Sequence, residues 1–202
     1  MKIEYHGHVG VDMKEWDDDD SPAQREETLR EGIKFRMSTA EITNISIENV
    51  TDPVKPYSRA YHVRVPGYAQ RTGKRLFIQP AFFQYGVGPL FPTSSRRHAI
   101  YFNYPWSEKD EVTIDLPPGF TFDNVDAPNP FAARPISEYK PMLQITNSGR
   151  TLIYKRAFYF GGDGNILFPV ESCSQLKNFF DNLHKQDNHT ITLKQAPAVA
   201  SQ

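Results

Sequence analysis

Residues 142–160 read MLQITNSGRTLIYKRAFYF, and this stretch decides the fold class. Two runs rich in β-branched and aromatic residues, 142–146 and 151–160, flank Asn147-Ser148-Gly149. These three residue types tolerate the positive φ angles that a tight turn between antiparallel strands requires. The stretch therefore predicts a β-hairpin.

Strand patterns continue on both sides of this hairpin. Residues 3–9 alternate apolar and polar side chains, which is typical of a half-buried strand. Further β-rich runs are closed by Pro, Gly or polar turn residues, and they cover 40–50, 57–65, 75–79, 98–104, 111–116 and 190–193. The Pro-rich stretch 128–141 is predicted to be irregular, because each proline removes a donor from a strand ladder.

Two helices are predicted from capping signals. Ser21, Pro22 and Gln24 form a capping-box start with proline at the first helical position, and we expect this helix to run to about residue 34. Ser172 and Gln175 repeat the capping-box spacing at the start of a second helix. The second helix carries an apolar stripe at positions i, i+3, i+4 and i+7, made of Leu176, Phe179, Phe180 and Leu183.

These elements predict a mainly β fold, an antiparallel β-sandwich of about nine strands with two short amphipathic helices. Aromatic residues make up 13% of the 202-residue chain, which favours strands over disorder. We expect one domain over residues 1–195 and a disordered tail over residues 196–202.

Composition excludes several classes of function. The formal net charge of −1 gives no global field for nucleic-acid binding. The chain contains no run of about 18 apolar residues, so the sequence predicts no insertion into a membrane. Residues 1–5 lack the apolar core of a signal peptide and read like the middle of a strand, so we interpret the chain as a segment of a longer protein in which Met1 is not the native start.

Cys173 is the single cysteine and the obvious candidate nucleophile. At a helix N-terminus its thiolate is favoured by the helix dipole. Catalysis also needs a base within hydrogen-bond reach, and His184 lies eleven residues further along the same predicted helix, about 16 Å away at 1.5 Å per residue. The simpler reading is a small apolar residue packed at a helix start, so we predict no catalytic residue.

Three segments resemble parts of metal sites. His6 and His8 would share one strand face, the run from Asp17 to Asp20 gathers carboxylates, and residues 161–165 are similar to part of a calcium loop. His6 and His8 lack a third ligand nearby, although His62, His98 or the 17–20 run could supply one. Residues 161–165 lack a downstream glutamate at the required spacing, and four consecutive acids cannot all face one ion. We therefore predict a solvated acidic loop at 17–20, a turn at 161–165, and no metal or other cofactor.

An aromatic loop is the remaining candidate site. Phe82, Phe83, Tyr85 and Phe91 lie in a segment interrupted by Gly and Pro, together with Leu90. Aromatic side chains with a polar edge are favoured at contact surfaces, so this loop is the candidate for binding a ligand or partner, namely a peptide, a glycan or a neighbouring domain. The alternative is that the loop closes one open end of the sandwich as part of its core.

The second half of the chain resembles a known kind of bacterial protein. The order of segments 98–106, 112–120, 168–169, 176–180 and 190–194 resembles the C-terminal region of bacterial transglutaminase-like proteins, with a strand ending in Tyr-Pro, a strand leading to Leu-Pro-Pro-Gly, and a final helix and strand. Residues 17–35 resemble the start of that region less closely. In such proteins a papain-like core with a Cys-His-Asp arrangement is flanked by β-rich domains.

The resemblance implies an accessory role. This chain would begin after the papain-like core, so no catalytic residue of the family is carried over to it. The function that we expect is that of a non-catalytic structural or interaction domain, whose partner is the transglutaminase-like core of the same polypeptide. The resemblance also implies a periplasmic or extracellular location. The alternative function is a carbohydrate- or peptide-binding module that uses the aromatic loop at 81–92.

Overall fold

The computed structural model describes residues 1–196 and divides into two compact units, Met1–Tyr68 (unit 1) and the remainder from Ala69 onward (unit 2). The fold is mainly β, with antiparallel sheets and α-helices, as the sequence predicts. The single domain over residues 1–195 stays a prediction, since it concerns cooperative folding. Apart from residue 196, the predicted tail lies outside the described residues.

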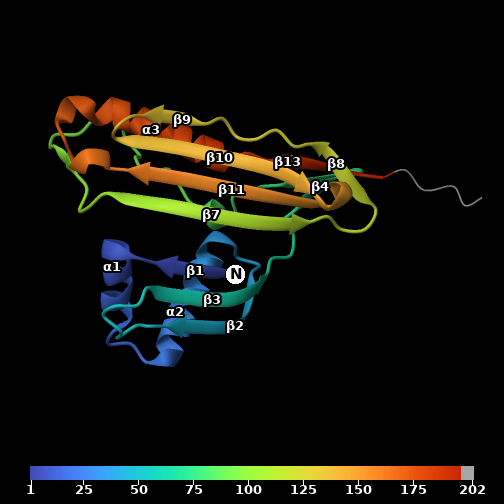
Figure 1. Cartoon of the computed structure of the whole chain (residues 1–202), viewed down its shortest axis with the longest axis horizontal. Helices are drawn as coiled ribbons and strands as arrows, with labels where there is room; N and C mark the ends of the chain where they lie inside the picture. Colours follow the sequence, from blue (N-terminus) through green and yellow to red (C-terminus); the bar gives the residue numbers. More distant parts are fainter. Residues whose placement is uncertain (197–202) are drawn as a thin grey trace, which may run out of the picture. The chain divides into compact units, whose positions relative to one another are not determined.

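Unit 1 is a three-stranded sheet with two helices (Figure 1). Its strands β1 (Lys2–Tyr5), β3 (Tyr57–Arg64) and β2 (Glu41–Glu48) lie in the order β1-β3-β2, with every pairing antiparallel. The helices α1 (Gly7–Asp17) and α2 (Pro22–Arg36) connect β1 to β2. The α2 capping box is confirmed, because Ser21 Oγ accepts from the Gln24 backbone and Gln24 Oε1 accepts from the Ser21 backbone.

The N-terminal strand ends earlier than predicted, and the helix α1 was not predicted. β1 stops at Tyr5, and α1 begins at Gly7, whose φ is +56°. The turn brings Gly10 against β1, where an added Cβ would lie only 2.6 Å from the Tyr5 carbonyl oxygen. A glycine at each of these two positions therefore lets the chain fold back, and the strand predicted over 3–9 is wrong beyond Tyr5.

Unit 2 contains two four-stranded antiparallel sheets. The first has the order β7-β11-β10-β9, with bounds Trp106–Asp115, Thr151–Phe160, Ser137–Thr146 and Phe131–Ala133. The second has the order β4-β5-β13-β8, with bounds Gln70–Thr72, Arg75–Ile78, Ile191–Gln195 and Phe120–Asn124. A two-stranded sheet pairs β12 (Leu167–Phe168) with β6 (Ile100–Tyr101).

The hairpin that opened the sequence analysis is confirmed. β10 and β11 pair in register from Ser137↔Phe160 to Thr146↔Thr151. The connecting residues have positive φ angles, +49° at Asn147, +51° at Ser148 and +83° at Gly149. This hairpin forms the centre of the first sheet, with β7 paired to the other edge of β11.

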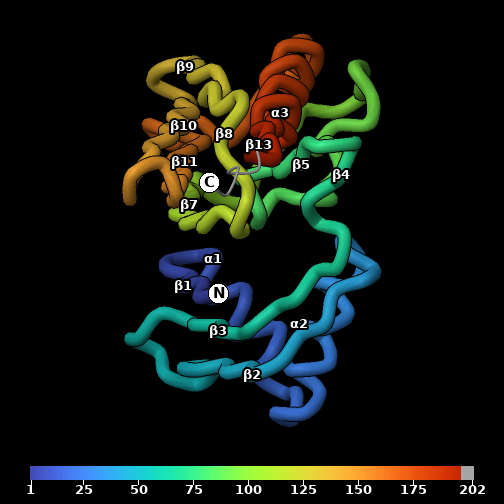
Figure 2. The backbone as a smooth tube through the Cα atoms, turned by 90° about the vertical axis from the view of Figure 1, so that its right-hand side faces the viewer, coloured from blue at the N-terminus to red at the C-terminus, as the bar shows by residue number. Residues whose placement is uncertain are grey.

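Unit 2 has a layered, sandwich-like arrangement. The first sheet forms one layer, and helix α3 (Cys173–Asp187) and the second sheet form the other (Figure 2). The stripe predicted on α3 packs against the first sheet. The cluster that results contains Phe91, Ile100, Tyr139, Phe158, Phe160, Phe168, Cys173, Leu176, Phe180 and Leu183, with Phe102, Trp106, Phe131, Ile136 and Phe179 packed against it.

The Pro-rich stretch 128–141 is more regular than predicted. It contains β9 and the first half of β10, and Pro141 lies within β10. β9 pairs only with Ser137–Tyr139, so the side of β10 that faces away from β11 is an edge at Pro141. A proline at an edge position need not remove a ladder hydrogen bond, which explains why the strand continues through it.

The second capping box is absent although its helix is present. A single 3₁₀ turn, Val170–Ser172, precedes α3, so Ser172 already has helical backbone angles, φ −77° and ψ −8°. A capping side chain needs an extended backbone to reach the exposed N–H groups, and Ser172 makes no such hydrogen bond. None of the helices over residues 1–196 is long and apolar enough to cross a membrane.

Candidate functional site

A buried charge cluster lies on the inner face of the first sheet of unit 2. Pairing places Asp110 on β7 opposite Arg156 on β11, and Glu108 lies two residues before Asp110 on the same face of β7. Asp187, the last residue of α3, completes the cluster from the other layer. These four residues (the Arg156 cluster) come from three elements that are far apart in the sequence.

Arg156 is the centre of this cluster and is only 2% exposed. Its Nε and Nη2 donate to the two carboxylate oxygens of Asp187, at 2.7 and 2.9 Å, in a bidentate pair. Its Nη1 donates to Glu108 Oε2 at 2.6 Å and to Asp110 Oδ2 at 3.3 Å. Bidentate charge-assisted pairs of this kind are strong and fix the geometry of both partners.

The electrostatics of the cluster are set by burial and by an excess of negative charge. Burial raises the pKa of both Asp110 and Asp187 above the ordinary value of 3.8, against the attraction of Arg156. Burial also opposes the charge on Arg156, but its hydrogen bonds to Asp187 and the charge of Glu108 outweigh that cost, so the Arg156 pKa is raised. The guanidinium therefore stays charged.

Polar groups without hydrogen-bond partners surround the cluster. The hydroxyls of Tyr139 and Tyr154 are fully buried, and neither meets hydrogen-bond geometry with any described residue. Burial raises the pKa of Tyr154 to about 12, so it is neutral at physiological pH. Gln84, in the 3₁₀ turn Phe82–Gln84, donates from Nε2 to Asp110 Oδ2 at 3.0 Å, while its Oε1 is buried and lacks a donor.

The sequence contains a signal for this cluster at position 156 of β11. Side chains of β11 alternate between faces, and its inner face is otherwise apolar, with Leu152, Tyr154, Phe158 and Phe160 buried. A charged residue at position 156 breaks that pattern. A buried charge requires a paired partner, so the alternation alone predicts a carboxylate facing Arg156, although it does not identify which one.

The predicted aromatic loop is divided by the structure. Phe91 is 3% exposed and packs in the core cluster, with its ring 5.4 Å from that of Phe180 and with Arg96 over its face. For Phe91 the core alternative therefore holds. Phe82, Phe83 and Tyr85 are half-buried, and the Phe82 and Phe83 rings contact each other edge to face at 5.8 Å. Their role in binding stays a prediction.

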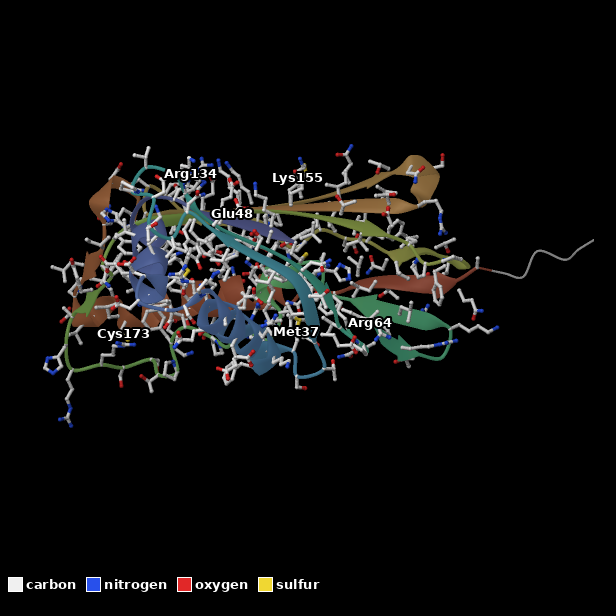
Figure 3. The ribbon with its side chains drawn as sticks, turned by 90° about the horizontal axis from the view of Figure 1, so that it is seen from below. Met37, Glu48, Arg64, Arg134, Lys155 and Cys173 are labelled. Atoms are coloured by element: carbon white, nitrogen blue, oxygen red, sulfur yellow. The ribbon has the colours of Figure 1, made fainter. Side chains whose placement is uncertain are left out.

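Cys173 is placed as the simpler interpretation expects. It is the first residue of α3, is 2% exposed and belongs to the hydrophobic core cluster. His184 lies on the same helix, three turns away. Cys173 lies on the inner side of the first sheet, and Figure 3 shows Lys155 of β11 projecting from the opposite side of that sheet. The Cys173 thiol is enclosed by the apolar side chains of that cluster.

The metal candidates are not assembled into a site. His8 lies in α1 and His6 precedes it, so the shared strand face that was predicted for them is wrong. Residues 162–164 form a 3₁₀ turn after β11, as predicted for a turn. Among residues 1–196, no three His, Cys, Asp or Glu side chains are grouped so that they could hold a metal ion.

The acidic run at 17–20 is only partly a solvated loop. Asp18 and Asp19 are exposed, but Asp17 is the last residue of α1 and is buried. The Tyr57 hydroxyl donates to Asp17 Oδ2, and Arg59 Nη2 lies 3.3 Å from the same oxygen. The prediction was wrong for Asp17 because β3 supplies both a hydroxyl and a cation, which compensate the buried carboxylate.

Comparison with known proteins places the chain in a family. The family model of DUF3858 matches residues 74–193, and that family is described as a domain of unknown function with solved-structure structure. The chain belongs to this family. The match covers more than half of the chain, lies within unit 2 and runs from the turn between β4 and β5 into β13. The Arg156 cluster therefore belongs entirely to the DUF3858 domain. No curated protein and no solved structure matches the chain.

Proposed function

We propose that this DUF3858 chain is a non-catalytic structural and interaction domain that packs beside a transglutaminase-like, papain-like core in a larger bacterial protein. The observation that carries the proposal is the burial of Cys173, the single cysteine, inside the hydrophobic core of the family domain. A nucleophile must be accessible and must lie beside a base. The partner assignment rests on the resemblance of segments 98–194 to the C-terminal region of transglutaminase-like proteins.

An exposed apolar pair supports a role in interaction. Tyr101 and Leu167 lie directly opposite each other in the β6–β12 sheet, and they are 62% and 65% exposed. The neighbouring pair, Ile100 and Phe168, points into the core. Apolar side chains that adjoin on a surface mark contact sites more often than isolated ones do.

The proposal is tested with the chain and the papain-like core encoded in the same reading frame. We expect the isolated chain to show no transfer of an amine to a glutamine-containing protein, and Cys173→Ala to leave this result unchanged. We expect the chain to bind the separately produced core, and Tyr101→Ser with Leu167→Ser to weaken binding at least tenfold. Lys155→Ser, on the outer face of β11, is the matched control and should bind like the wild type.

Either of two experimental results would contradict this proposal. One is a thiol-dependent turnover that Cys173→Ala abolishes. The other is a reading frame that encodes no papain-like core on either side of the chain. Calorimetric binding and gel-based amine incorporation provide the two measurements, and a melting curve for each variant shows that it is folded.

The alternative function is that of a carbohydrate- or peptide-binding module that uses the 81–92 loop, with Phe82, Phe83 and Tyr85 as contact residues. Their partial exposure supports it. On this alternative, Phe83→Ala and Tyr85→Ala abolish binding on a glycan or peptide array and leave the melting temperature nearly unchanged. A large drop in melting temperature instead identifies these rings as core.

A further inference from the structure

The Arg156 cluster contains more negative than positive charge. Glu108, Asp110 and Asp187 all contact one guanidinium, so the cluster carries two uncompensated negative charges when all three carboxyls are ionised. Arg156, Asp110 and Asp187 have 2%, 15% and 7% of their side-chain surface exposed, whereas 39% of the Glu108 side chain is exposed. Water can therefore stabilise an ionised Glu108 more than either aspartate.

Asp110 is the most weakly held of the three carboxylates. Its distance to Arg156 Nη1 is 3.3 Å, whereas Glu108 lies 2.6 Å from the same nitrogen and Asp187 makes two short bonds to the other side of the guanidinium. Like charges that share one partner do not all ionise at their ordinary pKa values. We expect the carboxyl with the longest contact to the guanidinium to bind a proton most readily.

A buried acceptor beside Asp110 lacks a donor. Gln84 contacts Asp110, and its buried Oε1 accepts no hydrogen bond. A protonated carboxyl donates through its O–H, whereas an ionised one only accepts. A proton on Asp110 thus adds a donor beside Gln84 Oε1, a buried acceptor that has none.

We propose that Asp110 is a built-in proton-binding group of the DUF3858 domain, which takes up one proton at a higher pH in the folded domain than in the unfolded chain and thereby stabilises the folded domain. The groups that face it are Glu108 on its own strand, Arg156 and Tyr154 on β11, Asp187 on α3 and Gln84 in the preceding turn. This inference does not depend on the proposed function.

The direction of the effect follows from linkage. Burial raises the pKa of Asp110 in the folded protein above 3.8, and the charge of Glu108 adds to the rise, while Arg156 opposes it. The folded state therefore binds the proton at a higher pH than the unfolded state does. The stabilisation is fully present below pH 3.8 and is lost as the pH rises through the raised pKa of Asp110.

The test is a carbon-13 NMR titration of the aspartate carboxyl groups in the whole chain, with Asp110 assigned through its own backbone amide. We expect the Asp110 carboxyl to titrate at a midpoint above 3.8 in the wild type. Glu108→Gln removes the neighbouring charge and should lower that midpoint. Glu111→Gln is the matched control, because it makes the same substitution on the outer face of β7, and it should leave the midpoint unchanged.

A second measurement follows stability. The melting temperature of Asp110→Asn should fall progressively behind that of the wild type as the pH drops from 7 to 4, because the variant cannot take up the proton. An Asp110 midpoint at or below 3.8 overturns the proposal, as do equal midpoint shifts in Glu108→Gln and Glu111→Gln. The wild-type titration decides the matter even if Asp110→Asn fails to fold.

Discussion

Arg156 shows how one residue organises the interior of this domain. It occupies an inward position of an otherwise apolar strand, and each of its polar nitrogens is engaged by a carboxylate. The guanidinium also lies over the Tyr139 and Phe158 rings, 5.7 and 5.6 Å from their centroids. Removing one partner of a buried ion pair leaves an uncompensated charge, which costs more than the pair itself contributes.

We therefore expect Arg156→Met to destabilise the domain by about 3–5 kcal/mol, since it leaves Asp187 and Asp110 buried without a cation. Urea unfolding followed by tryptophan fluorescence measures the change. Lys155→Met, at the next position of the same strand, removes only a surface pair with Glu111 and should cost about 1 kcal/mol or less. Equal losses in the two variants would show that Arg156 contributes no more to stability than a surface ion pair does.

At the scale of the element, the two serines at the helix starts show that the same sequence signal does not always give the same hydrogen bond. Ser21 and Ser172 both precede a glutamine at the capping-box spacing, yet only Ser21 has the extended backbone, with ψ of 156°, that lets its side chain cap. The 3₁₀ turn Val170–Ser172 fixes Ser172 in a helical conformation before α3 begins. Local sequence therefore predicted both helices but only one cap.

This difference leads to a paired prediction. Ser21→Ala removes a side-chain acceptor from the α2 N-terminus and should cost about 1 kcal/mol of unfolding free energy, the usual value of an N-cap. Ser172→Ala should cost only a few tenths of that, because Ser172 makes no capping hydrogen bond. Thermal unfolding of the two variants under identical conditions provides the comparison, and a larger loss for Ser172→Ala would contradict it.

At the scale of the whole molecule, the family match and the division into units agree on one boundary. The DUF3858 match begins at residue 74, a few residues after unit 2 begins at Ala69. Unit 2 also contains its own hydrophobic cluster and both four-stranded sheets. A segment with its own core can fold alone.

We expect a fragment of residues 69–202 to fold by itself, with a cooperative melting transition and a strand-rich circular dichroism spectrum. The whole chain, measured in parallel, provides the reference curve. A fragment that stays unfolded, while the whole chain melts in a single transition, would favour the single domain predicted over residues 1–195.

Local patterns determined most of the elements. Period-two alternation and turn residues identified the central hairpin, and the i, i+3, i+4, i+7 stripe identified the packed face of α3. The strands β4, β9 and β12 were not predicted, because they are two or three residues long and too short to show a period. The five-residue strand β8 was also missed. Helix α1 was missed because two glycines and a histidine pair obscured its apolar pattern.

The sequence by itself determined that this protein is mainly β, where its hairpin turns, and that Cys173 lies at the start of a helix, because these features depend on neighbours along the chain. Only the tertiary structure decided that Asp110, Arg156 and Asp187 meet, and that Asp17 is buried against Tyr57. These contacts join residues 31 to 46 positions apart. Local patterns along the sequence do not reveal which distant charges compensate one another, since that depends on how the layers stack.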